Sequence, residues 1–290
     1  MKEPIPVIFL VLPAILCFLS MDWPSPQGRM VKNFGWNEGG LPHLGIVFEG
    51  TESLGAAEGG ELLYRRQEGD TASRLPSPLG SWAAIDHGDG IISIYGRFKD
   101  EDESAPELPR LLERGGYLGE SGISGWSQRS GVFFQLFDRK ERRWINPAMI
   151  IAPPPDIRPP VITSIRLRDE QGTLIDPSVT RNLRQGRYVI IVQAVDTMLT
   201  ANESPLAPYR IICSLNGSEA GVLNFETYSA RDGVLMVFRN GLVPVRRVYA
   251  PAAAYEVADV WFTRGQTTLE VIAQDIAGNA RNVVYRLMVE

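Results

Sequence analysis

Short apolar runs with strand-like spacing recur along the whole chain, and helical spacing is hard to find. β-Branched and aromatic residues gather in brief segments that Gly, Pro, Asn or Asp bound on each side. In the first half these segments are residues 29–36, 43–49, 60–67, 81–98 and 130–145. In the second half they are residues 163–169, 187–196, 208–217, 221–228, 233–239 and 267–290. The pattern predicts an all-β protein.

Two turn sequences predict where strands reverse direction. Gly88-Asp89-Gly90 lies between two apolar runs, and positive φ costs little there, so we expect a hairpin. The sequence DIAGN at residues 275–279 separates two alternating segments and predicts the last hairpin. Asp275 and Asn279 could also ligate calcium, although turn chemistry alone explains both residues.

The tract APPPDIRPP at residues 152–160 predicts a linker between two domains. Proline lacks an amide donor, so this tract cannot join a hydrogen-bonded ladder. We therefore expect one β-rich domain at residues 28–151 and a second at residues 161–290. The spacing of short strands in the second domain predicts an immunoglobulin-like β-sandwich.

The first residues read as a leader. Residues 1–20 have Lys2 followed by an apolar run that Pro13 interrupts, and this run is short for a bilayer span but fits a signal peptide. The leader predicts export. Cleavage, lipidation at Cys17 and an uncleaved N-terminal membrane anchor stay open as alternatives. If the leader is removed, Cys213 has no partner for an internal disulfide and is expected to be a buried thiol.

Composition and charge exclude some functions. A hydrophobic content of 44% with 22% charged residues is typical of a folded protein. The net charge of −5 argues against a nucleic-acid partner, which needs clustered Lys and Arg. The acidic, proline-containing segment at residues 99–109 is interpreted as a solvated loop, with an acidic docking site as the alternative.

Six segments of the first half occur in the order of one family's motifs. They are GRMVKNFGW (28–36), PHLGIVFEG (42–50), LGAAEGGELLY (54–64), IDHGDGIISIYGRF (85–98), RGGYLGESGISG (114–125) and SGVFFQLFDRKERRWINP (130–147). As a set they resemble the lysostaphin-type (LytM, duplicated hybrid motif) zinc endopeptidases, which cut peptide cross-links in bacterial cell walls. The resemblance implies an antiparallel β-sheet domain at residues 28–151.

The resemblance also implies where metal and catalytic groups would lie. In that family zinc is held by the first His, by the Asp four residues later and by the second His of an H-x-H pair. Here the first position is His43 and the second is Val47, while the H-x-H pair falls on Phe133 and Gln135. The catalytic His of the family's Y-x-H segment falls on Arg97, two residues after Tyr95. We call the positions His43, Val47, Arg97, Phe133 and Gln135 the motif site.

The chain has too few histidines for the family's chemistry. His43 and His87 are its only two, and His87 matches the family's H-G-x-G turn, which is not a ligand. A zinc hydrolase needs three protein ligands and a group that handles the proton. We therefore expect no catalytic residue, no bound metal and no cofactor, with part of the site filled by apolar packing. The carboxylates that could serve as non-standard ligands are Glu49, Asp86, Asp89 and Asp138.

The leading hypothesis is a non-catalytic, peptidase-like protein in the periplasm or cell envelope of a bacterium. It would bind peptidoglycan, or regulate a wall hydrolase or division partner, through a groove. The residues expected to line this groove are His43, Tyr95, Arg97, Arg129 and Gln135, with arginine recognising carboxylates. One alternative is an active zinc endopeptidase with non-standard ligands. Another is a structural or adhesive envelope protein that binds through its Ig-like half.

Overall fold

The computed structural model describes residues 21–69, 75–100, 107–197, 204–251 and 253–290. In this part of the chain the helices are two 3-10 turns of three residues each, and strands form the rest of the regular structure. The predicted all-β fold class is confirmed. No helix in these ranges is long and apolar enough to cross a membrane. The expected leader with Cys17 lies outside the described residues, as do residues 101–106 of the acidic segment.

The N-terminal half is built on one antiparallel sheet. Its strands run in the order β9, β6, β7, β8, β11, β12, while β4 pairs with β11 and β1 pairs with β4. This half also has two separate two-stranded antiparallel sheets, β2 with β3 and β5 with β10. The elements are β1 (Arg29–Lys32), β2 (Asn37–Glu38), β3 (Leu41–Pro42), β4 (Ile46–Glu49), β5 (Ser53–Gly55), β6 (Gly60–Arg66), β7 (Ser81–Asp86), β8 (Ile91–Phe98), β9 (Leu111–Leu112), β10 (Tyr117–Glu120), β11 (Val132–Asp138), β12 (Arg143–Ile145) and η1 (Pro147–Met149).

The turn at residues 88–90 joins β7 to β8 as the sequence predicts. Asp86 pairs with Ile92 at the end of the ladder, and Gly88, Asp89 and Gly90 all have positive φ, at 80°, 49° and 91°. Glycine adopts this region without a Cβ penalty, so the two flanking glycines permit the tight reversal. The hairpin fixes the register of β8, the strand that carries Arg97.

The C-terminal half has two packed sheets. One contains β15, β24, β23, β17, β18, β19 and β20, and the other runs β14, β13, β16, β22, β21. Buried side chains from both sheets form one continuous core. The elements are β13 (Val161–Arg168), β14 (Leu174–Ile175), β15 (Asn182–Leu183), β16 (Gly186–Val195), β17 (Arg210–Leu215), β18 (Ser218–Arg231), β19 (Val234–Arg239), β20 (Leu242–Pro244), η2 (Val245–Arg247), β21 (Tyr249–Ala250), β22 (Ala254–Phe262), β23 (Gly265–Gln274) and β24 (Ala280–Val289).

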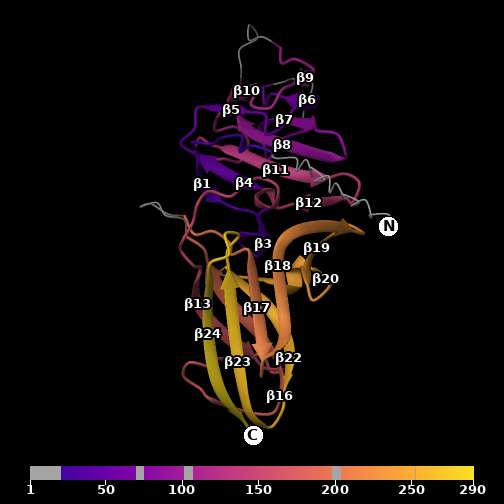
Figure 1. Ribbon diagram of the computed structural model, residues 1–290. Coiled ribbons are helices and arrows are strands. Elements are labelled where there is room, and N and C mark those ends of the chain that lie inside the picture. Colours follow the sequence, from indigo (N-terminus) through magenta and orange to yellow (C-terminus); the bar gives the residue numbers. More distant parts are fainter. Residues whose placement is uncertain (1–20, 70–74, 101–106, 198–203, 252) are drawn as a thin grey trace, which may run out of the picture.

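The long strand β18 joins the two halves into one sheet. Its first part pairs with β17, and its last part pairs with β12, where residues 143–145 lie opposite residues 227–229. Figure 1 shows β18 leaving the C-terminal half and running beneath β12. Backbone hydrogen bonds therefore cross the junction between the halves.

The loop after β1 inserts an aromatic side chain into the opposite half. Phe34 is 1% exposed and belongs to the core of the C-terminal half, against Tyr228 at 5.1 Å between ring centroids. Gly35 follows at φ 85°, and a Cβ there would come within 2.6 Å of the Phe225 ring. The carbonyl of Gly35 accepts a hydrogen bond from the Tyr249 hydroxyl at 2.8 Å. Glycine is needed here because the two halves approach so closely.

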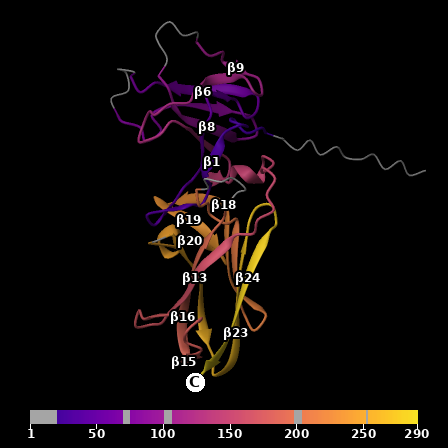
Figure 2. The same ribbon diagram turned by 90° about the vertical axis from the view of Figure 1, so that its left-hand side faces the viewer.

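Three asparagines of the N-terminal half also bond across the junction. Asn33 exchanges two hydrogen bonds with the backbone of Ala207, at 2.8 and 2.7 Å. Asn37 donates to the carbonyls of residues 250 and 254, and Asn146 donates to the carbonyl of Phe225 at 2.9 Å. The halves lie end to end in both views (Figures 1 and 2), held by these contacts and by the shared sheet.

The proline tract forms no strand, as expected. It runs between η1, which ends at Met149, and β13, which begins at Val161. Contacts tie it down on both sides: the Trp23 indole donates to the carbonyl of Ala152 at 2.9 Å, and the Asn279 amide donates to the carbonyl of Asp156 at 3.1 Å. The tract is thus one of several connections between the halves.

Candidate functional site

The strands that carry the motif site lie side by side. On β11, Phe133 pairs with Val47 of β4 on one side and with Gly96 of β8 on the other. Val47 is 2% exposed and Phe133 is 7% exposed. They pack with Val31 and half-buried Leu79 into a small apolar cluster that is separate from the two main cores. Hydrocarbon therefore fills the space between two positions where the motifs imply a carboxylate and an imidazole.

His43 lies beside this apolar cluster, in the segment between β3 and β4. Its ring meets the Phe133 ring edge to face, with centroids 5.7 Å apart. Nδ1 is 3.7 Å from a carboxylate oxygen of Glu38, and within the described residues the buried Nε2 has no hydrogen-bond partner. Burial lowers the pKa of His43 to about 4, against the opposing effect of Glu38. The imidazole is therefore neutral at pH 7.

Gln135 holds the segment that leads from His43 into β4. Its side chain is 8% exposed, and its Nε2 donates to the carbonyl of Leu44 at 2.9 Å. A buried amide needs such a partner, because an unsatisfied donor would cost about 1–3 kcal/mol. Gln135 is thus next to His43, as the motifs predict, but its amide bonds to the backbone.

Tyr95 was predicted to line the groove, but its side chain is buried and does not reach the surface. It is 0% exposed and packs on Phe134 in the core of the N-terminal half. Its hydroxyl oxygen accepts hydrogen bonds from the amide of Ala57 at 2.8 Å and from the hydroxyl of Ser93 at 2.9 Å. Tyr95 pairs with Phe134 of β11, and side chains alternate along β11, so Tyr95 lies on the face opposite Phe133 and Gln135.

Arg97 follows Gly96 on β8 with an unusual backbone. Its φ is 70°, a left-handed value that non-glycine residues rarely adopt. Its amide donates to the carbonyl of Leu79, and its carbonyl accepts from the amide of Gly122, both at 2.7 Å. These two hydrogen bonds hold the backbone of half-buried Arg97 beside Leu79, which belongs to the apolar cluster.

The loop that Arg97 anchors through Gly122 is exposed and partly apolar. Ile123 is 61% exposed and Trp126 is 77% exposed, and the Trp126 amide donates to the carbonyl of Pro78 at 3.3 Å. Arg129 is exposed on the same loop, where its backbone bonds to Ser127. Arg129, which was predicted to line the groove, thus lies on the same exposed loop as Trp126, and its described hydrogen bonds are within that loop.

The carboxylates considered as non-standard ligands do not complete a metal site at His43. Glu49 forms an ion pair with Arg29 at 3.0 Å, and Asp138 faces Arg143 at 3.4 Å. Asp86 lies 3.4 Å from Arg139, and Asp89 lies 3.9 Å from Lys140. A zinc site takes three nitrogen, sulfur or oxygen ligands from the protein. The side chains present around His43 do not fit that requirement.

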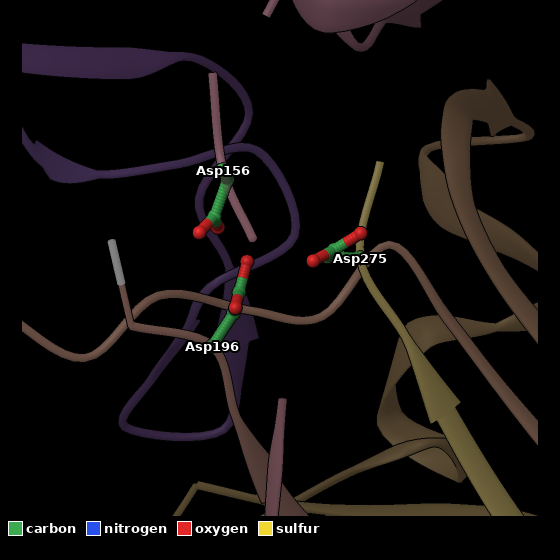
Figure 3. Close-up of side chains that lie close together, drawn as sticks. All are labelled: Asp156, Asp196 and Asp275. Carbon is green, nitrogen blue, oxygen red and sulfur yellow. The ribbon is translucent and has the colours of Figure 1, made fainter. Parts of the chain in front are cut away.

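Among the described residues, one group could hold a metal ion. Asp156 of the proline tract, Asp196 after β16 and Asp275 after β23 have carboxylate oxygens within 4.8 Å of one another. Figure 3 shows the three carboxylates turned toward a common space. We call them the aspartate cluster. They line a cavity of about 50 Å³ at the junction, which is too small for a peptide. Calcium and magnesium prefer such oxygen ligands, but carboxylates also gather without a metal.

The turn at Asp275 accounts for its own residues without a metal. Asn279 donates to Asp275 through its amide at 2.8 Å and through its side chain at 2.7 Å. The sequence identified this turn but missed Asp156 and Asp196, which are far away in the chain. No local spacing could have found them, because three separate segments bring the carboxylates together.

Comparisons with known proteins find likeness in part of the chain. A family model without a descriptive name matches residues 159–290. No curated protein matches. A solved structure described as an M23 peptidase from Pseudomonas aeruginosa is 24% identical, with a TM-score of 0.30, over 41% of this chain and 45% of its own. The present chain thus spans less than half of that protein.

Two further solved structures are similar over a comparable share. A variant of the catalytic domain of EnpA, a prophage-encoded M23 protein from Enterococcus faecalis, is 21% identical, with a TM-score of 0.33, over 41% of this chain and 86% of its own. A structure of the SpoIIQ–SpoIIIAH pore-forming complex is 16% identical, with a TM-score of 0.35, over 46% of this chain and 90% of its own.

Proposed function

We propose that this protein is a non-catalytic, peptidase-like protein of the bacterial cell envelope that acts by binding. Residues 28–151 would be a degenerate LytM-like domain, and residues 161–290 an Ig-like domain that holds it. The observation that carries the proposal is the buried pair of Val47 and Phe133, because it puts hydrocarbon at one zinc-ligand position of the family and at the first position of its H-x-H pair. The order of the six motifs supports the family, and the expected leader supports export.

The binding surface would be the motif site together with the loop beside it. Arg97 gives this surface a charge, and the exposed side chains of Ile123 and Trp126 give it apolar area. Tryptophan and arginine are the residues that most often dominate binding energy at interfaces. Peptidoglycan is the proposed ligand, with a protein of the cell envelope as the alternative partner.

Retention on purified peptidoglycan sacculi tests the proposal. The full chain without residues 1–20 is incubated with sacculi and sedimented, and the bound fraction is measured. Trp126→Ala is expected to reduce retention by about tenfold, since a central aromatic contact contributes about 1–2 kcal/mol. The matched control is Trp261→Ala on β22, which is 57% exposed and belongs to the opposite half.

Point variants are preferable to separated halves because the halves share a core. Removing either half would expose the Phe34 pocket or the Phe34 side chain. If sacculi do not retain the wild type, peptidoglycan binding is wrong. If Trp261→Ala abolishes retention while Trp126→Ala does not, the structural or adhesive alternative, in which the C-terminal half binds, is correct.

A further inference from the structure

The guanidinium of Arg97 is half-buried and has no partner within the described residues. It makes no hydrogen bond and no ion pair there, and only its longer-range electrostatic contacts with Glu38 and Glu49 remain. Burial lowers the pKa of Arg97, and this effect exceeds the opposing effect of the two carboxylates. A partly desolvated charge without a partner costs free energy.

The neighbouring carboxylates are each engaged by another cation. Glu38 pairs with Lys32, and Glu49 pairs with Arg29 at 3.0 Å. His43 is neutral at pH 7, because burial lowers its pKa to about 4. Among these described side chains, each of the two carboxylates is paired with a cation other than Arg97.

The backbone of Arg97 is held in a costly conformation by its surroundings. The φ of Arg97 is 70°, in the left-handed region that is strained for a residue with a Cβ. Backbone hydrogen bonds to Leu79 and Gly122 hold this conformation, and Leu79 belongs to the apolar cluster of Val31, Val47, Leu79 and Phe133. Backbone strain of this kind is concentrated at binding sites.

We propose that Arg97 binds a carboxylate of the ligand, so that the motif site recognises carboxylate-bearing peptides. A guanidinium presents two parallel N–H donors that match the two oxygens of a carboxylate. One monoanionic group pairs with the guanidinium, and the half-buried side chain of Leu79 is the part of the apolar cluster that can contact the adjoining hydrocarbon. This inference rests on the proposed function and names the chemistry of its ligand: the carboxylates of peptidoglycan peptides.

The test compares native sacculi with sacculi whose carboxylates have been converted to amides. Wild-type protein is expected to bind the amidated material at least about tenfold more weakly, because one charge-assisted hydrogen bond is lost. Arg97→Gln is expected to bind both materials at that weak level. Arg97→Lys keeps the charge but loses the two-donor geometry, and is expected to lie between the two.

If binding depended only on the overall charge, amidation of the sacculi would strengthen binding and not weaken it. The chain has a net charge of −5, so removing negative charge from sacculi would strengthen non-specific binding. The matched control is Arg264→Gln, an exposed arginine between β22 and β23, which is expected to bind like wild type. Thermal unfolding of Arg97→Gln within a few degrees of wild type establishes that the variant is folded.

A second measurement does not depend on any variant. In wild-type protein, the Nε–H resonance of Arg97 is expected to shift when soluble peptides released from native sacculi are added, and not with their amidated form. Equal binding of wild type to native and amidated sacculi overturns the inference but leaves the proposed function intact. Failure to bind either material overturns both. Undiminished binding of Arg97→Gln to native sacculi also overturns the inference.

Discussion

The motif site and the aspartate cluster are opposite in chemistry and in origin. At the motif site, adjacent strands bring together the positions that the motifs align, but Val47 and Phe133 fill the centre with hydrocarbon. At the aspartate cluster, three carboxylates converge from segments that share no motif. The difference shows that the order of the motifs predicts how the strands are arranged, which we call the backbone frame. Whether the frame can hold a metal depends on the ligand atoms that each side chain supplies. A frame without these donors agrees with the proposed binding function.

Rebuilding donors in the motif site should have the largest effect. Val47→Asp buries a charge at a position that is 2% exposed, and we expect a loss of about 4–5 kcal/mol in the free energy of unfolding. Combined with Gln135→His, it supplies the ligands that the family uses with His43. We expect this double variant to bind one zinc and to recover stability when zinc is added, measured by chemical denaturation.

The control for that experiment adds His43→Ala to the double variant. Zinc should then neither bind stoichiometrically nor restore stability. If the double variant stays folded but fails to bind zinc, residues 43, 47 and 135 do not have the arrangement that the motifs imply. The motif site would then not be a zinc-site backbone that lacks only its ligands.

Phe34→Ala should have the next largest effect, because it empties a site in the core that the halves share. We expect a loss of about 3–4 kcal/mol, typical of a buried Phe→Ala substitution. Phe238→Ala is the matched control, since Phe238 is 43% exposed, and it should cost under about 1 kcal/mol. A similar loss in the two variants would contradict the close packing of the junction.

The pH dependence of stability should report the buried His43. Its folded pKa of about 4 lies below the ordinary value of 6.5, so the unfolded chain binds a proton first as the pH falls. Stability should therefore decline between about pH 6.5 and pH 4, by about 3 kcal/mol from this residue. His43→Gln should remove that share of the decline in denaturation curves. An unchanged pH profile would show that His43 is accessible to water.

The smallest expected effect is at the aspartate cluster. With divalent cations chelated, three nearby carboxylates repel one another, so Asp156→Asn should raise stability by up to about 1 kcal/mol. Asparagine keeps an oxygen that can accept from the amide of Arg158, as Asp156 does at 3.0 Å. If Asp156→Asn is instead less stable than wild type under chelation, the carboxylate of Asp156 makes a favourable interaction that outweighs the repulsion.

Much of the fold could be predicted from the sequence, with one clear omission. Apolar spacing and turn residues predict the β7–β8 and β23–β24 hairpins, which the structure confirms. Strand β22 was missed although it lies inside its sheet, between β16 and β21. A bulge opposite Ile190 and Ile191 shifts its register, so buried Val257 and Ala258 are adjacent and the alternation breaks.

The candidate site was predicted in part, and what was missed depends on three-dimensional packing. The motifs identify the residues that meet at β4 and β11, and the apolar replacement at Phe133 is visible in the sequence. Strict alternation along the strand would put Tyr95 and Arg97 on the same face. The pairing of Tyr95 with Phe134 and the left-handed φ of Arg97 separate them, and the sequence alone does not show either feature. Whether Arg97 has an ion-pair partner among the described residues depends on which cations engage Glu38 and Glu49, and no local sequence pattern predicts that pairing.

The most direct test of the central claim is the zinc content of the wild-type protein. The chain without residues 1–20 is incubated with excess zinc, desalted and measured by elemental analysis, alongside His43→Ala. The account predicts much less than one zinc per chain at the motif site, so wild type and His43→Ala should retain equal amounts. One zinc per wild-type chain that His43→Ala loses would contradict the account and favour the active endopeptidase.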